Sequence, residues 1–217
     1  MRKKQVTLFG ATGLIGNFLL KIILDDPYFH KVILVTRKPI LFKHKKLEIK
    51  IIDFSVPKKI EKSLQKSSVV FSAIGTTQAQ VKGDKIAYRK IDFDITQSIA
   101  LACKKMDVEK FLFVSSAGAN SANSSFYLKL KGEIDDAILN LKLNSTLIFR
   151  PSLLLGKRNQ FRVGEKIAQI LIPLFSFLMP QKLKPVKGEH VATAMVKLSK
   201  LAEHGNRIIE NDELLTL

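Results

Sequence analysis

The chain has 217 residues, 46% of them apolar, and its 36 Lys and Arg against 19 Asp and Glu give a net charge of +17. This length predicts one domain with ample material for a hydrophobic core. The apolar share, with 11 Gly and 7 Pro, excludes a disordered or collagen-like chain. The single cysteine, Cys103, excludes an internal disulfide framework and is typical of a reducing compartment. The four histidines are scattered, so we expect no metal site.

A charge of +17 favours anionic partners, such as nucleic acid, phosphorylated cofactors or acidic lipid surfaces. The lysines are spread along the whole chain, however, and no basic run is interleaved with aromatic residues. The charge therefore indicates a solvated surface first, and we expect no specific nucleic-acid partner.

The basic start, Arg2 to Lys4, and the apolar stretch up to Leu20 have some features of a secretory signal. Glycines interrupt that stretch, and charged residues follow it in place of a small-residue cleavage site, so we expect folded protein there. The most apolar stretch, 167–179, is shorter than the roughly 20 residues of a spanning helix. We expect no transmembrane segment and a cytoplasmic protein, with peripheral contact to a membrane left open.

Short apolar strands alternate with helical patterns along the chain. Strands are predicted over 5–9, 31–36, 47–52, 69–74, 110–115 and 145–150. Helices are predicted over 14–24, 58–65, 86–106 and 124–141. Several of the strands are apolar on both faces, which is typical of a parallel sheet covered by helices on both sides. The sequence therefore predicts an α/β fold, a Rossmann-like doubly wound parallel sheet.

The alternation weakens after residue 150, where helices are predicted over 163–172 and 190–201 and a short strand over 207–210. We expect residues 1–217 to form one domain and 151–217 to be a reduced portion of it on the substrate side. An apolar stripe at helical spacing predicts a mobile flap over 161–180 that covers the cleft at the carboxyl ends of the strands. The rival interpretation is membrane docking, because three lysines follow directly, at 182, 184 and 187.

A glycine-rich turn joins the first predicted strand to the first predicted helix. Glycines in this context allow a tight turn, close approach of a pyrophosphate and close helix–strand packing. Backbone N–H groups at the helix N-terminus would then bind the phosphates. The predicted dinucleotide-binding residues are Gly10, Ala11, Thr12, Gly13, Leu14, Ile15 and Gly16.

The end of the second strand predicts the form of the dinucleotide. An acid there would bind the 2′-hydroxyl of NAD, whereas this strand ends in Arg37 and Lys38, which favour the 2′-phosphate of NADP. Asp53 and Phe54, after the third strand, are candidates for contact with the adenine. The end of the fourth strand is expected to face the middle of the cofactor, with Ala73, Ile74, Gly75 and Thr76.

A group of polar residues follows the fifth predicted strand. Ser115 and Ser116 end that strand, and Tyr127 and Lys131 lie four residues apart in the next helix, on one face. A tyrosine can move a proton to a carbonyl when a nearby ammonium favours its phenolate, and a serine hydroxyl can orient the same oxygen. The sequence therefore predicts a Ser–Tyr–Lys catalytic set.

Several stretches, in order, resemble the short-chain dehydrogenases/reductases, specifically an atypical member of the extended type in the Tat-interacting-protein-like branch. They are residues 10–16, 71–77, 114–119, 127–133 and 149–151. The resemblance implies NADP(H) on a Rossmann fold, with Tyr127 as acid/base and Lys131 activating it and holding the ribose. It implies that Ser116 orients the substrate, with Ser115 the alternative, and that Pro151 and Leu153 pass beside the nicotinamide.

Two features depart from that family. Relatives often carry an asparagine in the helix after the fourth strand, as part of a proton relay, and Asp92 stands at that position in this chain. The substrate portion is also much reduced, which argues against a sugar-nucleotide substrate.

Three functions remain open. The first is an NADP-dependent oxidoreductase acting on a small carbonyl or alcohol substrate, as a monomer or homodimer. The second is a non-catalytic NADP(H)-binding regulator. The third is a nucleic-acid or membrane-surface protein driven by the charge.

Overall fold

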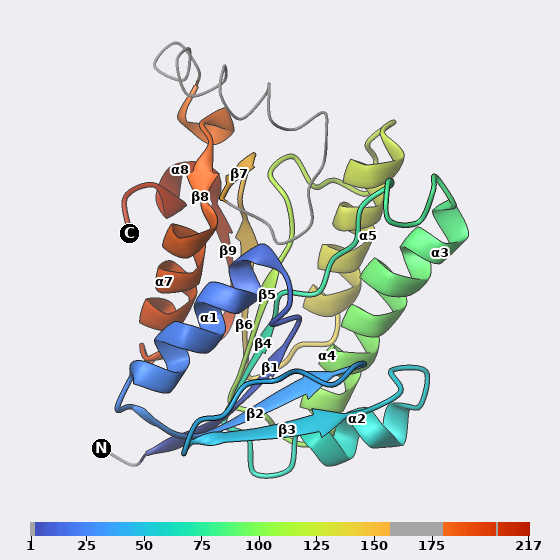
Figure 1. Cartoon of the computed structure of the whole chain (residues 1–217). Helices are drawn as coiled ribbons and strands as arrows, with labels where there is room; N and C mark the ends of the chain where they lie inside the picture. The colour runs from blue at the N-terminus through green and yellow to red at the C-terminus, as the bar shows by residue number, and fades with distance from the viewer. Residues whose placement is uncertain (1–2, 157–179, 203) are drawn as a thin grey trace.

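The computed structural model describes residues 3–156, 180–202 and 204–217 (Figure 1). The predicted helix over 163–172 lies outside these residues, as does the predicted flap over 161–180 except for its last residue.

Seven parallel strands form the central sheet, in the order β3-β2-β1-β4-β5-β6-β9. The chain builds outward from β1 to β3 and then returns to place β4 on the other side of β1. The carboxyl ends of β1 and β4 therefore flank the point where the strand order reverses, which is where open α/β sheets bind ligands. The strands are β1 (Lys4–Phe9), β2 (Phe29–Thr36), β3 (Leu47–Ile51), β4 (Val69–Ser72), β5 (Lys110–Val114), β6 (Ser145–Arg150) and β9 (Gly205–Glu210).

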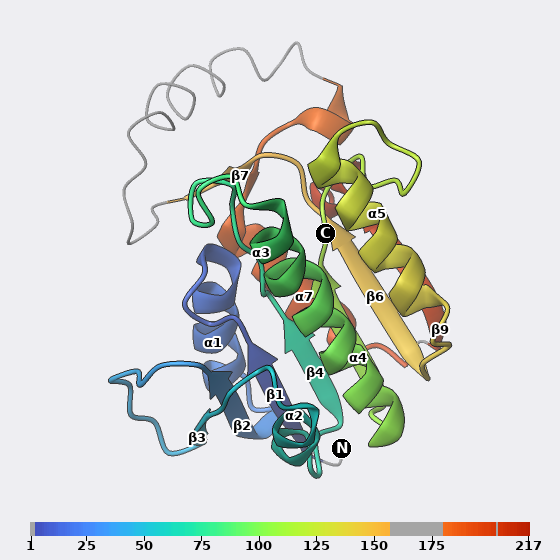
Figure 2. The ribbon, with the colours of Figure 1, turned by 90° about the vertical axis from the view of Figure 1, so that its right-hand side faces the viewer.

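Helices cover both faces of the sheet, which confirms the predicted Rossmann-like α/β fold. In Figures 1 and 2, α1 (Leu14–Asp25) and α7 (Gly188–Ser199) pack side by side on one face. The other face carries α2 (Pro57–Ser63), α4 (Ile95–Lys105) and α5 (Phe126–Leu139).

The helix predicted over 86–106 is one continuous helix with three consecutive segments. It begins as α3 (Lys85–Arg89), widens into a π-helical turn (Lys90–Asp94) and continues as α4. Asp84 caps the start, because its side chain accepts hydrogen bonds from the Ile86 and Ala87 N–H groups.

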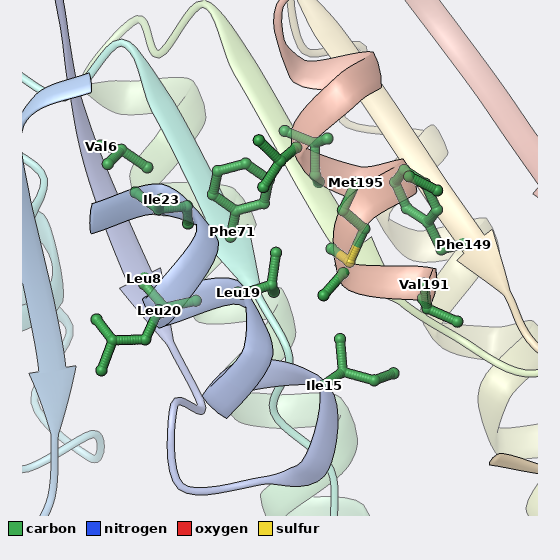
Figure 3. Packing of buried hydrophobic residues seen from close by; sticks show 14 of the residues in the cluster. Val6, Leu8, Ile15, Leu19, Leu20, Ile23, Phe71, Phe149, Val191 and Met195 are labelled. Carbon is green, nitrogen blue, oxygen red and sulfur yellow. The ribbon is translucent and has the colours of Figure 1, made fainter. Parts of the chain in front are cut away.

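Alternate residues of the central strands build two separate cores. In β1, Leu8 packs toward α1 and α7, whereas the next residue, Phe9, packs toward α2 and α4. Figure 3 shows the first core, where Leu19 of α1 and Met195 of α7 meet Phe71 of the sheet. This two-sided burial explains why the strands carry almost continuous apolar runs.

Small elements beyond β6 extend the carboxyl edge of the sheet. β7 (Leu154–Leu155) pairs with β8 (Val186–Lys187), next to a 3₁₀ turn, η3 (Gln181–Leu183), and the chain ends after α8 (Asn211–Leu214). The buried Asn211 joins these pieces, since its amide donates to the Gln181 and Lys184 carbonyl oxygens and its Oδ1 accepts from Ser152 N–H at 2.8 Å. Two-residue strands carry no periodic pattern, so the sequence does not predict them. Throughout the described residues, no helix has the length and apolar character needed to cross a membrane.

Candidate functional site

Two glycines of the phosphate loop are required by the packing of the protein itself. Gly10 has φ +84°, and a Cβ there would lie 2.5 Å from the carbonyl carbon of Ala73. A Cβ on Gly16 would lie 2.1 Å from the Gly10 carbonyl oxygen. Any side chain at either position would collide with backbone, so the turn between β1 and α1 can close against the end of β4 only with glycine.

The packing of the protein does not require glycine at the middle position, Gly13. It stands at the N-cap of α1 with φ −79°, and the atom nearest to a Cβ at this position would be the Gly10 carbonyl oxygen, at 3.4 Å. The chain itself therefore tolerates a side chain at this exposed position. Among the described residues no side chain caps α1, and its first turn contains no acid. The free N–H groups and the bare backbone fit a bound pyrophosphate, as the sequence predicts.

The remaining loop side chains support this backbone cradle. Ala11 and Ile15 are buried in the core beneath the loop, while Thr12 is exposed above it. Leu14 turns toward the C-terminal part of the chain, where a Cβ on Gly156 or Gly188 would lie within 2.8 Å of its side chain. The loop is therefore packed directly against the β7–β8 region.

The stretch after β4 is fastened to the helix that follows. Ala73 N–H donates to the Phe9 carbonyl oxygen at 3.0 Å, and Ile74 continues over Gly10. Beyond the exposed Gly75, Thr76 N–H donates to Asp92 Oδ1 at 2.7 Å. The Thr76 carbonyl oxygen accepts from the Tyr88 hydroxyl at 3.1 Å. The N–H and the carbonyl oxygen of Thr76 are therefore both hydrogen-bonded to the following helix, which fixes the end of the predicted cofactor-facing segment.

The predicted adenosine-side residues lie at the ends of β2 and β3. Arg37 and Lys38 are exposed, in a turn that the Thr36 hydroxyl stabilises through the Lys38 backbone. Asp53 Oδ1 accepts from the Ser55 N–H and hydroxyl at 2.8 and 2.7 Å, and these bonds lower the pKa of Asp53. The Phe54 ring packs on Phe9, with centroids 6.0 Å apart.

Tyr127 and Lys131 lie one turn apart at the start of α5, as their spacing predicts. Lys131 Nζ is 5.9 Å from the centroid of the Tyr127 ring. The edge of Tyr88 meets the Tyr127 ring, with centroids 6.3 Å apart and an interplanar angle of 81°. The ammonium and the phenol therefore lie close together, between α3 and α5.

From the sequence, Asp92 stands out only as a departure from the family pattern. In the structure, Asp92 lies in the π-helical turn and forms an ion pair with Lys131, with Nζ and Oδ2 2.7 Å apart. The Asp92 side chain is 1% exposed and that of Lys131 is 8% exposed. Burial opposes the charged ammonium, but Asp92, together with Tyr127 and Tyr88, outweighs it, and the pKa of Lys131 is raised.

The two candidate serines have different surroundings. Ser115 is buried, and its N–H donates to the Phe149 carbonyl oxygen at 2.7 Å, which continues the pairing of β5 with β6. Its hydroxyl faces the interior, near Asp135 of α5. Ser116 is partly exposed, and its hydroxyl donates to the Ala117 carbonyl oxygen over a long 3.4 Å contact. Ser116 is therefore the more accessible of the two.

A second buried ion pair, not predicted from the sequence, lies behind the serines. Asp135 Oδ2 is 2.9 Å from the Arg150 guanidinium, which also bonds Glu210 at 2.9 Å. The signal available in the sequence was an acid on the apolar side of the predicted helix. The residues after Arg150 were predicted to flank the nicotinamide: Pro151 is buried and its carbonyl oxygen accepts from Ala117 N–H at 2.9 Å, while Leu153 is exposed.

A glycine cradle at the reversal of strand order, followed by a Tyr–Lys pair after β5, defines a Rossmann-fold NAD(P)-binding protein of the short-chain dehydrogenase/reductase type. The model of a family described as NAD(P)H-binding matches residues 10–171. The chain belongs to this NAD(P)H-binding family, as an atypical short-chain dehydrogenase/reductase.

Curated relatives span most of the chain. Protein FMP52, mitochondrial, from Debaryomyces hansenii is 34% identical over 198 residues, which cover 88% of this chain and 86% of that protein. Protein HTATIP2 from Rattus norvegicus is 31% identical over 172 residues, which cover 78% of this chain and 70% of that protein.

A solved structure supports the fold. The UDP-N-acetylglucosamine 4-epimerase from Methanobrevibacter ruminantium M1 has a TM-score of 0.74, covering 97% of this chain and 77% of that chain. The sequences are 18% identical, so this likeness shows the fold alone.

The expected cytoplasmic location is wrong. The FMP52 relatives from Debaryomyces hansenii, Candida albicans and Meyerozyma guilliermondii are all named mitochondrial proteins. The lack of a recognisable targeting or spanning segment does not identify a compartment.

Proposed function

We propose that this protein is an NADP-dependent oxidoreductase that interconverts a small carbonyl compound and its alcohol. The observation that carries the proposal is the Tyr127–Lys131 pair, with Nζ 5.9 Å from the ring centroid, on the helix after β5. The phosphate loop opens at the same edge of the sheet. The names of the FMP52 relatives favour mitochondria as its location.

The cofactor would lie along the carboxyl edge of the sheet. The pyrophosphate is assigned to the N–H groups at the start of α1, over Gly13, and the 2′-phosphate to Arg37 and Lys38. Asp53 and Phe54 are assigned to the adenine side. The segment from Ala73 to Thr76 is assigned to the middle of the dinucleotide, and Pro151 and Leu153 to the nicotinamide end.

The nicotinamide, when bound, supplies or accepts the hydride. The chain's own residues handle the proton. The Tyr127 hydroxyl donates it to the carbonyl oxygen during reduction and takes it back during oxidation, and the Ser116 hydroxyl orients that oxygen. The Lys131 ammonium stabilises the phenolate form of Tyr127, and we assign it the ribose hydroxyls as well.

Replacing the acid tests the proposed chemistry. Tyr127→Phe keeps the ring, so we expect NADPH affinity within about twofold of wild type and turnover reduced at least about 100-fold. NADPH titration and steady-state rates over a panel of small carbonyls measure the two effects. Tyr28→Phe, which changes a tyrosine packed on Phe29, is the matched control.

Two results would contradict this assignment. A Tyr127→Phe variant that keeps most of the wild-type rate would place the acid elsewhere. A wild-type protein that binds NADPH but turns over no member of the panel would favour the regulatory alternative, a sensor of NADP(H).

Cofactor choice tests the assignment of Arg37. Wild type is expected to bind NADPH more tightly than NADH, and Arg37→Asp to reverse that order, because a charged contact to the 2′-phosphate becomes a repulsion. The expected change is on the order of tenfold to a hundredfold in the ratio of dissociation constants, measured by calorimetry. Lys43→Asp makes the same charge change elsewhere on the exposed β2–β3 loop and should leave the order unchanged. Equal wild-type affinities would refute the assignment.

A further inference from the structure

The Asp92 carboxylate has both oxygens engaged, and its two partners come from different parts of the chain. Oδ1 accepts from Thr76 N–H at 2.7 Å, in the segment after β4. Oδ2 lies 2.7 Å from Lys131 Nζ, on α5. One buried side chain therefore joins the proposed cofactor-facing segment to the proposed catalytic lysine.

The groups that face Lys131 make Asp92 its counter-ion. Tyr127, on its own helix, and Tyr88, on α3, also act on it, and Asp135, one turn further along α5, interacts with its charge as well. The charged Arg89 and Glu133 lie on the same two helices, but they pair with each other at 2.5 Å and are more exposed. No second acid is paired with Lys131 in the described part of the chain.

The helix carrying Asp92 is widened at this residue. A π-helical turn spans Lys90–Asp94, between regular α-helical segments on both sides. Such turns are rare, and they occur frequently at functional sites because they re-aim a side chain. In this helix the turn presents Asp92 to Lys131 and Thr76 together.

We infer that Asp92 is a positioning residue of the active site, whose carboxylate keeps the Lys131 ammonium charged and holds it in place beside Tyr127 and the Thr76 segment. The asparagine that relatives often carry at this position could accept the same Thr76 hydrogen bond, but it could not neutralise a buried ammonium. The functional part of this inference rests on the proposed oxidoreductase role. The interaction between the two charges does not, so the two can be tested separately.

The first test follows thermal unfolding of Asp92→Asn against pH, without cofactor or substrate. In wild type the pKa of Lys131 is raised, so the stability from its charge is present below the unfolded value of about 10.4 and lost only above it. In the variant, burial without a counter-ion lowers the folded pKa of Lys131 below the unfolded value. The unfolded state then binds more protons, so the variant should regain stability relative to wild type as pH rises from 7 to 10.

The expected deficit in Tm is on the order of 10 °C at pH 7, shrinking steadily toward pH 10. Asp94→Asn changes an exposed acid of the same π-helical turn and should follow the wild-type curve. A deficit that stays constant across this range would overturn the inference, because loss of packing alone does not depend on the charge of Lys131.

A second variant covers the case in which Asp92→Asn does not fold. The double variant Asp92→Asn/Lys131→Met removes both charges, so we expect it to fold with a higher Tm than either single variant at pH 7. A double variant no more stable than the less stable single one would show that the two residues are not a charge pair.

The functional test is the pH dependence of carbonyl reduction with NADPH. Asp92→Asn should lose its rate on the alkaline side at least one pH unit below wild type, as Lys131 loses its proton. A rate that is only scaled down, with an unchanged profile, would refute the positioning role. If wild type reduces no carbonyl, the proposed function fails, while the unfolding measurements still decide whether Asp92 holds the charge of Lys131.

Discussion

Two buried ion pairs lie one turn apart on α5, and they connect to different parts of the molecule. Lys131 pairs with Asp92 at the carboxyl edge of the sheet, next to Tyr127. Asp135 pairs with Arg150, which reaches on to Glu210 at the end of β9. The first pair joins α5 to the proposed site, and the second joins α5 to the outer strands of the sheet.

Burial opposes the charged form in both pairs, but the outcome for the pKa differs. For Lys131, burial opposes the charge, yet Asp92, Tyr127 and Tyr88 together prevail and the pKa of Lys131 is raised. For Asp135, burial prevails over the nearby Ser115 hydroxyl and the Arg150 guanidinium, and the pKa of Asp135 is raised, toward the neutral form. Arg150 divides its attraction between two carboxylates, whereas Asp92 serves one ammonium. The cost of burying a charge can exceed the attraction of its partner, as it does for Asp135.

Arg150→Met should have the largest effect on this comparison. It leaves the Asp135 carboxylate buried without a cation, so we expect a loss of about 3–5 kcal/mol in unfolding free energy at pH 7. Urea unfolding measures the loss. Adding Asp135→Leu to the same chain should restore part of it, and a double variant as unstable as Arg150→Met alone would show that packing, not charge, sets the cost.

The pH dependence of Asp135 should be the next largest effect. The folded pKa of Asp135 lies above its unfolded value of about 3.9. At pH values between the two, the folded state therefore binds more protons than the unfolded state. Wild type should therefore gain stability relative to Asp135→Asn as pH falls from 7 toward 4. The matched comparison is Lys131→Met, whose difference from wild type should vary less over the same range, since Lys131 titrates far above it. Parallel curves for wild type and Asp135→Asn in urea unfolding would contradict a raised pKa for Asp135.

Glu210→Gln should have the smallest effect. Its side chain is 41% exposed, so solvent screens the bond to Arg150, and we expect a loss of about 0.5 kcal/mol or less that added salt abolishes. Urea midpoints at low and high salt measure it. A loss comparable to that of Arg150→Met would mean that the outer carboxylate, rather than Asp135, is the main partner of Arg150.

Much of the proposed site could be predicted from the sequence because its residues follow strands in a fixed order. The phosphate loop needs glycine at positions 10 and 16, because a side chain there would collide with backbone atoms, and glycines can be read directly from the sequence. The alternation of strands and helices is a local signal, since each strand buries both faces. The carboxyl ends of parallel strands lie at one edge of the sheet. The order of the strands therefore predicts that Arg37, Ser116 and Tyr127 lie at that same edge.

The pairing of single residues was decided only by the tertiary structure. Asp92 meets Lys131 because a π-helical turn breaks the 3.6-residue period on which the predicted helix depended. Asp135 meets Arg150 and Glu210 because α5, β6 and β9 are neighbours in space and not along the chain. Local sequence patterns fix which face of an element is apolar, but a buried charge finds its partner through long-range packing, and no period in the sequence encodes that contact.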